Sequence, residues 1–310
     1  MKKVGIIGGS GYIGSYTTKI FLDHGFKVKV STTDITRKDK YQHLMKLNNA
    51  ENLYISELNV EDKTALLDFV SDCELVIHGG TPFILNVQNP QTELFDPTIK
   101  GTENFLEAIK KTSSVEKVVF IASVAAWNTD FPMSANGKNL SDTFDETDTK
   151  FTSPESHPYA QAKFIANRTV EKFIVDNPNL PFEISSVSPV FVAGKSMSNR
   201  EDSTSIGMQY LIKNKIAPDA FVQALYDNNV GFAIVNVEDV AKAIYNAATT
   251  KGLHGKNYLL VSETYKISDM NLMLNHHEPM GNPDIIYKND LARKDLRMNF
   301  KSAKETLNSY

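Results

Sequence analysis

The chain has 310 residues, enough for one large α/β domain or for such a domain with a smaller lobe. A formal net charge of −4 gives no electrostatic footprint for nucleic acid or for an anionic membrane surface, and no apolar run is long enough to span a bilayer, so we expect neither partner. The single cysteine, Cys73, excludes an intramolecular disulfide, and the seven histidines show no metal-ligand spacing; we therefore expect no metal site and a reducing, cytoplasmic location.

Short strands and helices alternate along the first 190 residues. Apolar runs rich in β-branched and aromatic residues predict strands at 3–7, 26–31, 53–57, 74–78, 117–122 and 182–188. Helical periodicity predicts helices at about 12–23, 36–47, 61–71, 91–112 and 160–176. Such alternation predicts an α/β fold of the Rossmann type, a doubly wound parallel sheet that binds its ligands at the carboxyl ends of the strands.

The alternation becomes irregular after Pro189. One clear strand-helix pair follows within 230–249. We predict a dinucleotide-binding domain over 1–189, to which 230–249 returns. The segments 190–229 and 250–310 are then expected to form a small C-terminal lobe that binds the substrate.

The stretch "GGSGYIG" carries glycines at a three-residue spacing, Gly8, Gly11 and Gly14, between the first strand and the first helix. At such a junction the glycines allow a tight turn, let a pyrophosphate approach the backbone and permit close helix-strand packing. The turn therefore predicts a dinucleotide site. We assign Tyr12 and Ile13, at the start of the helix, to the same site.

The residues after the second strand bear on which dinucleotide binds. An acidic residue at its end would hold the ribose hydroxyl of NAD, whereas cationic and hydroxyl residues accommodate the additional phosphate of NADP. Here "VSTTDITRKDK" places hydroxyl residues first and cations close behind, and we assign Thr33, Arg37 and Lys40 to this phosphate. The sequence favours NADP and leaves NAD possible.

Later strand ends supply further cofactor contacts. Glu57 and Leu58, after the third strand, are expected to touch the adenine ring. Gly79, Gly80 and Thr81, after the fourth strand, are expected to line the central ribose and phosphate with their backbone.

A Tyr-Lys pair in "SHPYAQAKF" is predicted to be catalytic. Tyr159 and Lys163 lie one helical turn apart, and a neighbouring ammonium lowers the pKa of a phenol that must exchange a proton with a carbonyl oxygen. Such pairs also occur on ordinary helix surfaces, but this helix follows the fifth strand of a dinucleotide fold. Ser123 ends that strand, where it can either orient a substrate oxygen or cap the strand end; we favour the catalytic role.

These motifs, together with "SPVFVAG" at 188–194, resemble the extended short-chain dehydrogenases/reductases, the NAD-dependent epimerase/dehydratase superfamily. The stretches "HGGTPF", "PTIKGTENFLEA" and "STTDITRKDKYQHL" are similar to the branch of dihydroflavonol reductases, cinnamoyl-CoA reductases and aldehyde reductases. The resemblance implies Tyr159 as proton donor, Ser123 as its partner, Lys163 as a ligand of the nicotinamide ribose, and Pro189 and Val192 beside the nicotinamide.

The chain departs from that branch in two places. The plant enzymes carry an arginine where this chain has Thr33, although Lys40 matches a lysine that binds the cofactor phosphate there. The polar insert at 128–156 also differs from the plant pattern, so flavonoid or phenylpropanoid substrates do not follow.

The resulting hypothesis is an NADP-dependent oxidoreductase, monomeric or homodimeric, that reduces a small aldehyde or ketone to an alcohol. One alternative is a nucleotide-sugar epimerase or dehydratase with tightly bound NAD, although such enzymes usually carry an acidic residue at the end of the second strand. The other alternative is a catalytically inactive regulator that senses the cofactor, in which Tyr159 or Lys163 would be expected to be missing.

Overall fold

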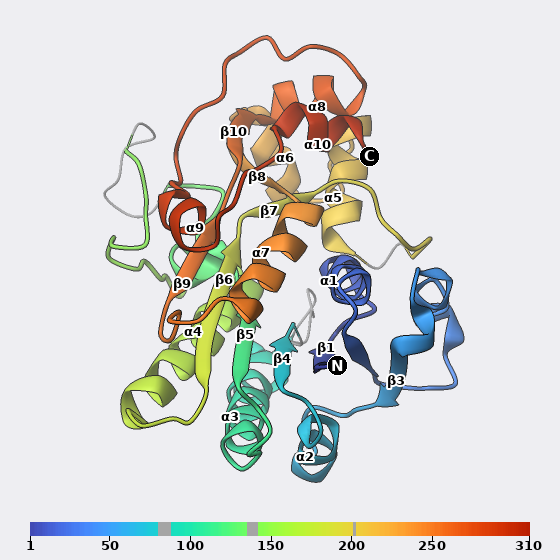
Figure 1. The fold of residues 1–310 in the computed structure, drawn as a ribbon. Coiled ribbons are helices and arrows are strands. Elements are labelled where there is room, and N and C mark those ends of the chain that lie inside the picture. Colours follow the sequence, from blue (N-terminus) through green and yellow to red (C-terminus); the bar gives the residue numbers. More distant parts are fainter. Residues whose placement is uncertain (80–87, 135–141, 201–202) are drawn as a thin grey trace.

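A seven-stranded parallel sheet forms the centre of the protein (Figure 1). The computed structural model describes residues 1–79, 88–134, 142–200 and 203–310. The strand order is β3-β2-β1-β4-β5-β6-β9. The strands are β1 (Lys3–Ile7), β2 (Lys27–Thr32), β3 (Leu53–Glu57), β4 (Leu75–His78), β5 (Lys117–Ile121), β6 (Glu183–Pro189) and β9 (Asn257–Leu260). Because β1 pairs with both β2 and β4, the order of strands reverses there, and in sheets of this type ligands bind at the carboxyl ends of the strands at such a point.

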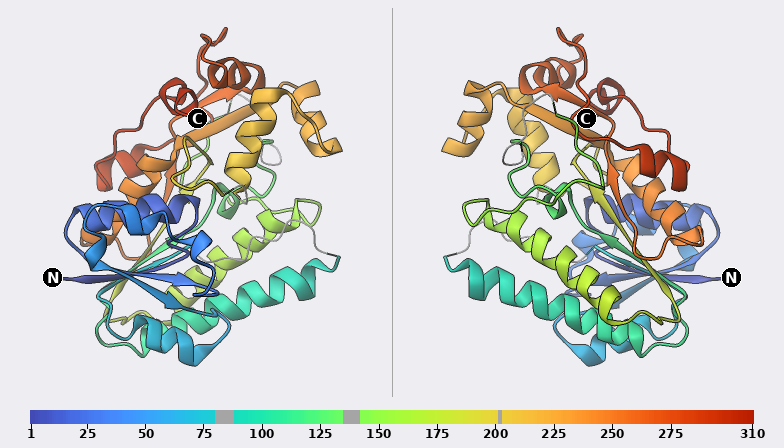
Figure 2. Two further views of the ribbon diagram at one scale, coloured as in Figure 1. Left: turned by 90° about the vertical axis from the view of Figure 1, so that its right-hand side faces the viewer. Right: turned by 90° about the vertical axis from the view of Figure 1, so that its left-hand side faces the viewer.

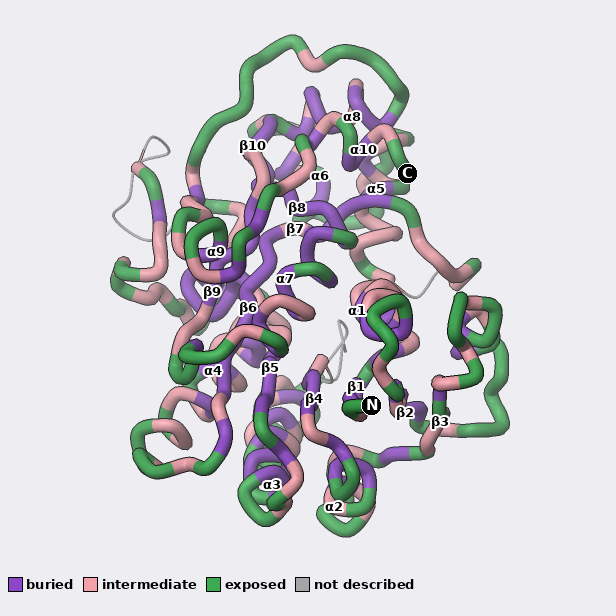
Figure 3. The backbone as a smooth tube through the Cα atoms, viewed as in Figure 1, coloured by how far each residue is buried: buried purple, intermediate pink, exposed green. Residues whose placement is uncertain are grey.

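Helices cover both faces of this sheet, as predicted (Figure 2). One face carries α1 (Tyr12–Asp23) and α7 (Val237–Thr249), and the opposite face carries α2 (Lys63–Val70), α3 (Asp96–Lys110) and α4 (Pro158–Asp176). Apart from the edge strand β3, the strands between them are buried along most of their length (Figure 3). Among the described residues, no helix combines the length and apolarity needed to cross a bilayer.

A smaller lobe stands at one end of the sheet (Figure 1). Its three-stranded sheet has the order β10-β8-β7, made of β10 (Glu263–Lys266), β8 (Gly231–Asn236) and β7 (Phe191–Ala193). Helices α5 (Thr204–Asn214), α6 (Ala220–Asp227), α8 (Ile267–Leu274) and α10 (Ala303–Asn308) pack around it, and α9 (Asp290–Asp295) packs against β9. Since β7 directly follows β6, the lobe rises from the carboxyl end of the large sheet.

Two strands lie in different sheets from those expected. β8, from the segment 230–249, pairs with β7 and β10 in the small sheet, and only the helix α7 of that segment returns to the large one. Conversely, β9 pairs with β6 and completes the large sheet. Both strands are buried and apolar, and such a pattern does not specify which neighbour a strand pairs with.

The prediction of a helix at 36–47 is wrong. Two short 3₁₀ turns, Lys38–Lys40 and Leu44–Lys46, occupy the region instead, and a third, Ala50–Asn52, follows it. Local side-chain bonds compete with helical ones here, because the Asp34 carboxylate accepts from the Thr36 backbone N–H at 2.8 Å. The expected helix 91–112 becomes a π turn at Gln91–Phe95 followed by α3.

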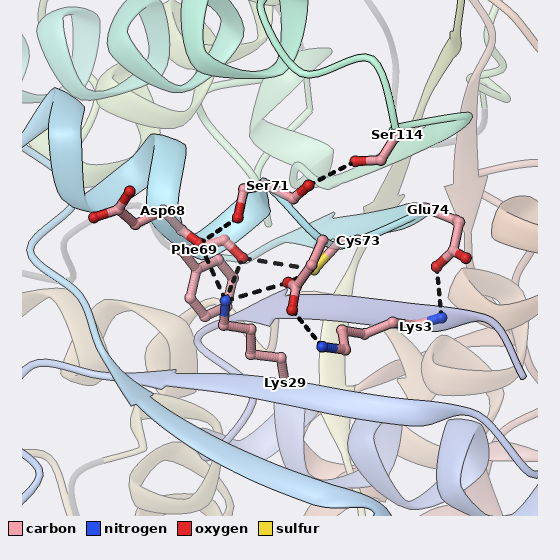
Figure 4. A network of polar contacts seen from close by, with 9 residues as sticks. Lys3, Lys29, Asp68, Phe69, Ser71, Cys73, Glu74 and Ser114 are labelled. Carbon is pink, nitrogen blue, oxygen red and sulfur yellow. Dashed lines mark hydrogen bonds and ion pairs between the residues drawn. The ribbon is translucent and has the colours of Figure 1, made fainter.

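An ionic cluster joins β1 and β2 to the segment that follows α2 (Figure 4). The Lys29 ammonium on β2 donates to the carbonyl of Phe69 at 2.9 Å, at the carboxyl end of α2, and lies 3.3 Å from an Asp72 carboxylate oxygen. Lys3 pairs with the same carboxylate. Cys73 is fully buried beside them, and burial raises the pKa of its thiol to about 12. The lone cysteine thus packs as a small apolar residue.

Candidate active site

Two glycines of the turn between β1 and α1 could not carry a side chain without strain. Gly8 has a φ of +81°, which favours glycine, and a Cβ on Gly14 would lie 2.1 Å from the Gly8 carbonyl oxygen. α1 begins after Gly11, which has no side chain to bond the first backbone N–H groups, and its first turn carries no acidic residue. These N–H groups and the positive end of the helix dipole fit a pyrophosphate.

Two of the expected phosphate ligands lie together at the end of β2. The Lys40 ammonium lies 3.4 Å from the hydroxyl of Thr33. Arg37 points elsewhere: its guanidinium makes two 2.9 Å bonds to the carboxylate of Asp39. The Asp34 carboxylate is held by Thr36, whose N–H and hydroxyl keep the pKa of Asp34 below its usual range. An acidic residue therefore follows β2, but its carboxylate is already hydrogen-bonded.

Segment 194–200, which follows β7, crosses the start of α1. The phenol of Tyr12 donates to the Gly194 carbonyl at 2.8 Å, and the phenol of Tyr16 donates to the Lys195 carbonyl at 2.8 Å. Burial raises the pKa of Tyr12 well above its usual value. The Tyr12 side chain thus joins the lobe to α1.

Arg200, in the same segment, reaches the Gly-rich turn. Its Nη1 donates to the carbonyl of Ser10 at 3.4 Å and to the carbonyl of Lys40 at 3.3 Å. Sequence reasoning missed this residue. A single arginine in the polar stretch "KSMSNREDSTS" matches no motif, and only the folded chain brings it to the turn.

The remaining residues assigned to the cofactor lie in varied surroundings. A Glu57 carboxylate oxygen accepts from the backbone N–H of Ile35 at 3.1 Å, and the Leu58 side chain is buried in the apolar core that contains α2 and α3. Gly79 donates to the Ile7 carbonyl at 3.0 Å, which places it beside the Gly-rich turn. Ile13 packs against the core on the α1 face. Gly80 and Thr81 lie outside the described residues.

The elements that carry Ser123 and Tyr159 pack against each other. Ser123 follows β5 and starts the 3₁₀ turn η5 (Val124–Ala126), where its Oγ accepts from the Ala125 N–H at 3.2 Å. α4 packs against η5 and begins at Pro158, two residues earlier than expected. Proline suits the first helical position, and His157 Nδ1 accepts from the Tyr159 N–H at 3.2 Å. Tyr159 therefore lies in a well-fixed first turn.

Lys163 is buried one turn further along α4. Its ammonium lies 3.5 Å from the Ile121 carbonyl, at the end of β5, and 5.9 Å from the centre of the Tyr159 ring. Burial lowers the pKa of Lys163 to about 8. The expected lowering of the phenol's pKa is not found: burial raises the pKa of Tyr159 above its usual value. The Tyr159 phenol is thus protonated at neutral pH, the form in which it can donate a proton.

One more residue lies beside Lys163, and two others lie where the lobe begins. His78, the last residue of β4, packs against Phe105 and shares a small cavity with Lys163; burial and the Lys163 charge lower the pKa of His78 to about 3, so its ring is neutral. Pro189 ends β6, and Val192 lies in β7; both are buried where the lobe leaves the large sheet.

Among the described residues, no group of His, Cys, Asp and Glu could hold a metal ion.

The family model described as "NAD dependent epimerase/dehydratase family" matches residues 4–260. The chain belongs to this family. It is 31% identical over 258 residues to the cinnamoyl-CoA reductase CAD2 of Medicago truncatula, an alignment that covers 80% of this chain and 74% of that protein. This relative is a cinnamoyl-CoA reductase and thus belongs to the branch that the sequence motifs resemble.

Solved structures share the fold of this family member over its whole length. Gre2 of Candida albicans, in complex with NADPH, matches with a TM-score of 0.82 and 23% identity, covering 100% of this chain and 97% of that one. The UDP-glucose 4-epimerase of Stenotrophomonas maltophila, with bound NAD, matches with a TM-score of 0.76 and 14% identity, covering 100% and 96%. Because reductases and epimerases share this fold, the fold does not distinguish the two reactions, and the residues of the site must do so.

Proposed function

We propose that this protein is an NADP-dependent reductase that converts a small aldehyde or ketone to an alcohol, with Ser123, Tyr159 and Lys163 as its catalytic residues. The observation that carries the proposal is the packing of α4 on η5. It puts a buried lysine, a protonated phenol and a serine hydroxyl on adjoining elements at the carboxyl end of the large sheet. The names of the curated relatives, such as cinnamoyl-CoA reductase, support the same reaction class.

Reduction of a carbonyl group requires a hydride for its carbon and a proton for its oxygen. A bound nicotinamide cofactor supplies the hydride. Tyr159 donates its phenolic proton to the carbonyl oxygen, and Ser123 orients that oxygen through its hydroxyl. Lys163 places a positive charge one turn below Tyr159, which stabilises the phenolate left after proton transfer.

Four features favour this cofactor and its position. The uncapped start of α1 and the glycines of the turn accommodate the pyrophosphate. Thr33 and Lys40 lie together at the end of β2, where the 2′-phosphate of NADP is expected. The carboxylate of Asp34, which could otherwise hold a ribose hydroxyl, is bonded to Thr36. The NADPH bound to Gre2 agrees with this assignment.

The test is a spectrophotometric assay of the purified protein with a panel of small aldehydes and ketones. We expect oxidation of added NADPH at 340 nm, with kcat lowered by about 10²–10⁴-fold in Tyr159→Phe. The rival function, a nucleotide-sugar epimerase or dehydratase, predicts instead that the protein is purified with nicotinamide cofactor already bound. Absence of turnover on every carbonyl, combined with such retained cofactor, would reject the reductase proposal.

A further inference from the structure

The two ends of the polar insert at 128–156 meet between the elements that carry Ser123 and Tyr159. We propose that Thr129 and Ser156, one at each end of the insert, are positioning residues, and that the hydrogen bond between their hydroxyl groups fixes the spacing of Ser123 and Tyr159. This role rests on the proposed function, because it concerns the residues assigned to catalysis there. It also gives a task to the ends of an insert that no sequence motif explains.

A chain of hydrogen bonds runs through these two hydroxyl groups. The Ser156 hydroxyl donates to the Asp130 carboxylate, which uses its single proton. The Thr129 hydroxyl, 2.7 Å away, therefore donates to the Ser156 oxygen, and the Ser153 N–H donates to the Thr129 oxygen at 3.1 Å. Thr129 is 2% exposed and Ser156 is 7% exposed. Because both groups are shielded from water, a lost partner leaves a buried polar atom unpaired.

On one side, this chain of hydrogen bonds continues into the turn that begins at Ser123. The Asn128 N–H donates to the Val124 carbonyl at 2.9 Å, which extends the turn η5 to Asn128. The next residue, Thr129, is held across the insert, since its N–H donates to the Phe151 carbonyl at 3.2 Å. A displacement of Thr129 would therefore reach Ser123 through one short turn.

On the other side, Ser156 is tied to the start of α4. The Gln161 side chain, early in α4, donates from its Nε2 to the Ser156 carbonyl at 2.7 Å. Ser156 precedes Tyr159 by three positions, so the same turn of chain carries both residues. A displacement of about 1 Å between reacting groups can cost about a hundredfold in rate. The bond between the two hydroxyl groups is thus placed where a small movement would affect catalysis.

Trp127, the single tryptophan of the chain, reports on this junction. Its side chain is 5% exposed, and the Lys150 ammonium lies 4.6 Å from its ring centre. Its carbonyl accepts from the Phe151 N–H at 2.7 Å. Loss of the bond between Thr129 and Ser156 should loosen the two ends of the insert and admit water to the indole ring. The fluorescence emission of Trp127 should then shift to longer wavelength, whatever reaction the protein catalyses.

The experiment measures kcat and KM in the NADPH assay, together with the tryptophan emission, in variants of the full chain. For Thr129→Val we expect kcat to fall by about 10–100-fold, the KM for NADPH to change by less than about threefold, and the emission to shift. Thr129→Ser keeps the hydroxyl group and should hold kcat within about threefold of the unaltered protein. Thr129→Val/Ser156→Ala should be slower than the slower single variant by no more than about twofold, because both changes break the same chain of bonds.

Thr306→Val is the matched control. The Thr306 hydroxyl, fully buried in α10 of the lobe, donates to the Ser302 carbonyl at 2.8 Å and accepts from Asn236 Nδ2 at 3.2 Å. This variant therefore loses a similar pair of buried bonds. We expect it to lower the free energy of unfolding in urea about as much as Thr129→Val does, and to leave kcat and the tryptophan emission unchanged. Should Thr129→Val not fold, Ser156→Ala removes only one oxygen and gives the same comparison.

Two results would overturn the inference. An unchanged kcat and emission in Thr129→Val would show that the bond holds nothing in place. A fall in kcat no larger than in Thr306→Val would reduce the bond to a general contribution to stability. Conversely, a protein that reduces no carbonyl, but whose emission shifts in Thr129→Val and not in Thr306→Val, would support the role of the bond and reject the proposed reaction.

Discussion

Replacing Gly14 with alanine tests whether the Gly-rich turn and α1 are as closely packed as the structure requires. The added Cβ would lie 2.1 Å from the Gly8 carbonyl oxygen and 2.7 Å from the Gly9 Cα, so α1 must move away from the turn by about 1 Å. Alanine in a helix favours folding by roughly 1 kcal/mol over glycine. Overpacking of this kind costs about 1–3 kcal/mol and sometimes more. Because both contacts are to backbone that cannot rotate away, we expect a net loss of about 1–2 kcal/mol.

Gly101→Ala is the matched control for this substitution. Gly101 lies inside α3, and a Cβ there meets nothing within 4 Å, so the same change should raise the free energy of unfolding by roughly 0.5–1 kcal/mol. Urea denaturation measures both variants, and calorimetry measures their affinity for NADP⁺. We expect Gly14→Ala to lose affinity because the displaced helix carries the pyrophosphate site with it. If Gly14→Ala is as stable as the unaltered protein and binds the cofactor equally well, the assigned packing and its role are both refuted.

Three other predictions concern the site. Tyr159→Phe should lower kcat by about 10²–10⁴-fold with little change in cofactor affinity, since it removes the proton donor and keeps the ring; near-normal turnover in the NADPH assay would exclude Tyr159. Lys40→Ala should lower the ratio of kcat/KM values for NADPH and NADH by about tenfold, and Arg37→Ala, whose guanidinium is bonded to Asp39, should lower it less; the reverse ranking would contradict the positions described here. Burial lowers the pKa of Lys163 from 10.5 to about 8, so this lysine should make the free energy of unfolding rise with pH between those values, whereas the raised pKa of Cys73 opposes the rise above the ordinary thiol pKa of 9.0. In urea titrations, the difference in free energy of unfolding between the unaltered protein and Lys163→Met should therefore grow with pH from about 8 to about 10.5.

Local patterns predicted most of the large sheet, because each of its first six strands is a short apolar run that can be recognised in the sequence by itself. The Gly8 to Gly14 spacing and the Tyr159–Lys163 pair are likewise local, and the structure brings the elements that carry them to the same end of the sheet. The position of β9 was not predictable in this way. Its pairing with β6 joins segments about 70 residues apart, and periodicity contains no information about such partners.

The loop after β2 shows a second kind of failure. Its residues have the spacing of a helix, but bonds between Asp34 and Thr36 and between Arg37 and Asp39 stabilise turns instead. The same bonds change the expected site, since Arg37 faces Asp39. Arg200 reaches that place from across the molecule, and no sequence pattern links the two segments.

The burial of Cys73 makes the protein suitable for labelling at chosen positions. Burial raises the pKa of its thiol to about 12, so the thiol stays protonated at neutral pH, and the side chain is not exposed to a reagent. A cysteine introduced at Val175, 77% exposed on α4, and another at Met280, 83% exposed beyond α8, would therefore be the reactive thiols of the folded chain. Fluorescent dyes at those two sites would report the distance between the large sheet and the lobe while the native cysteine stays in place.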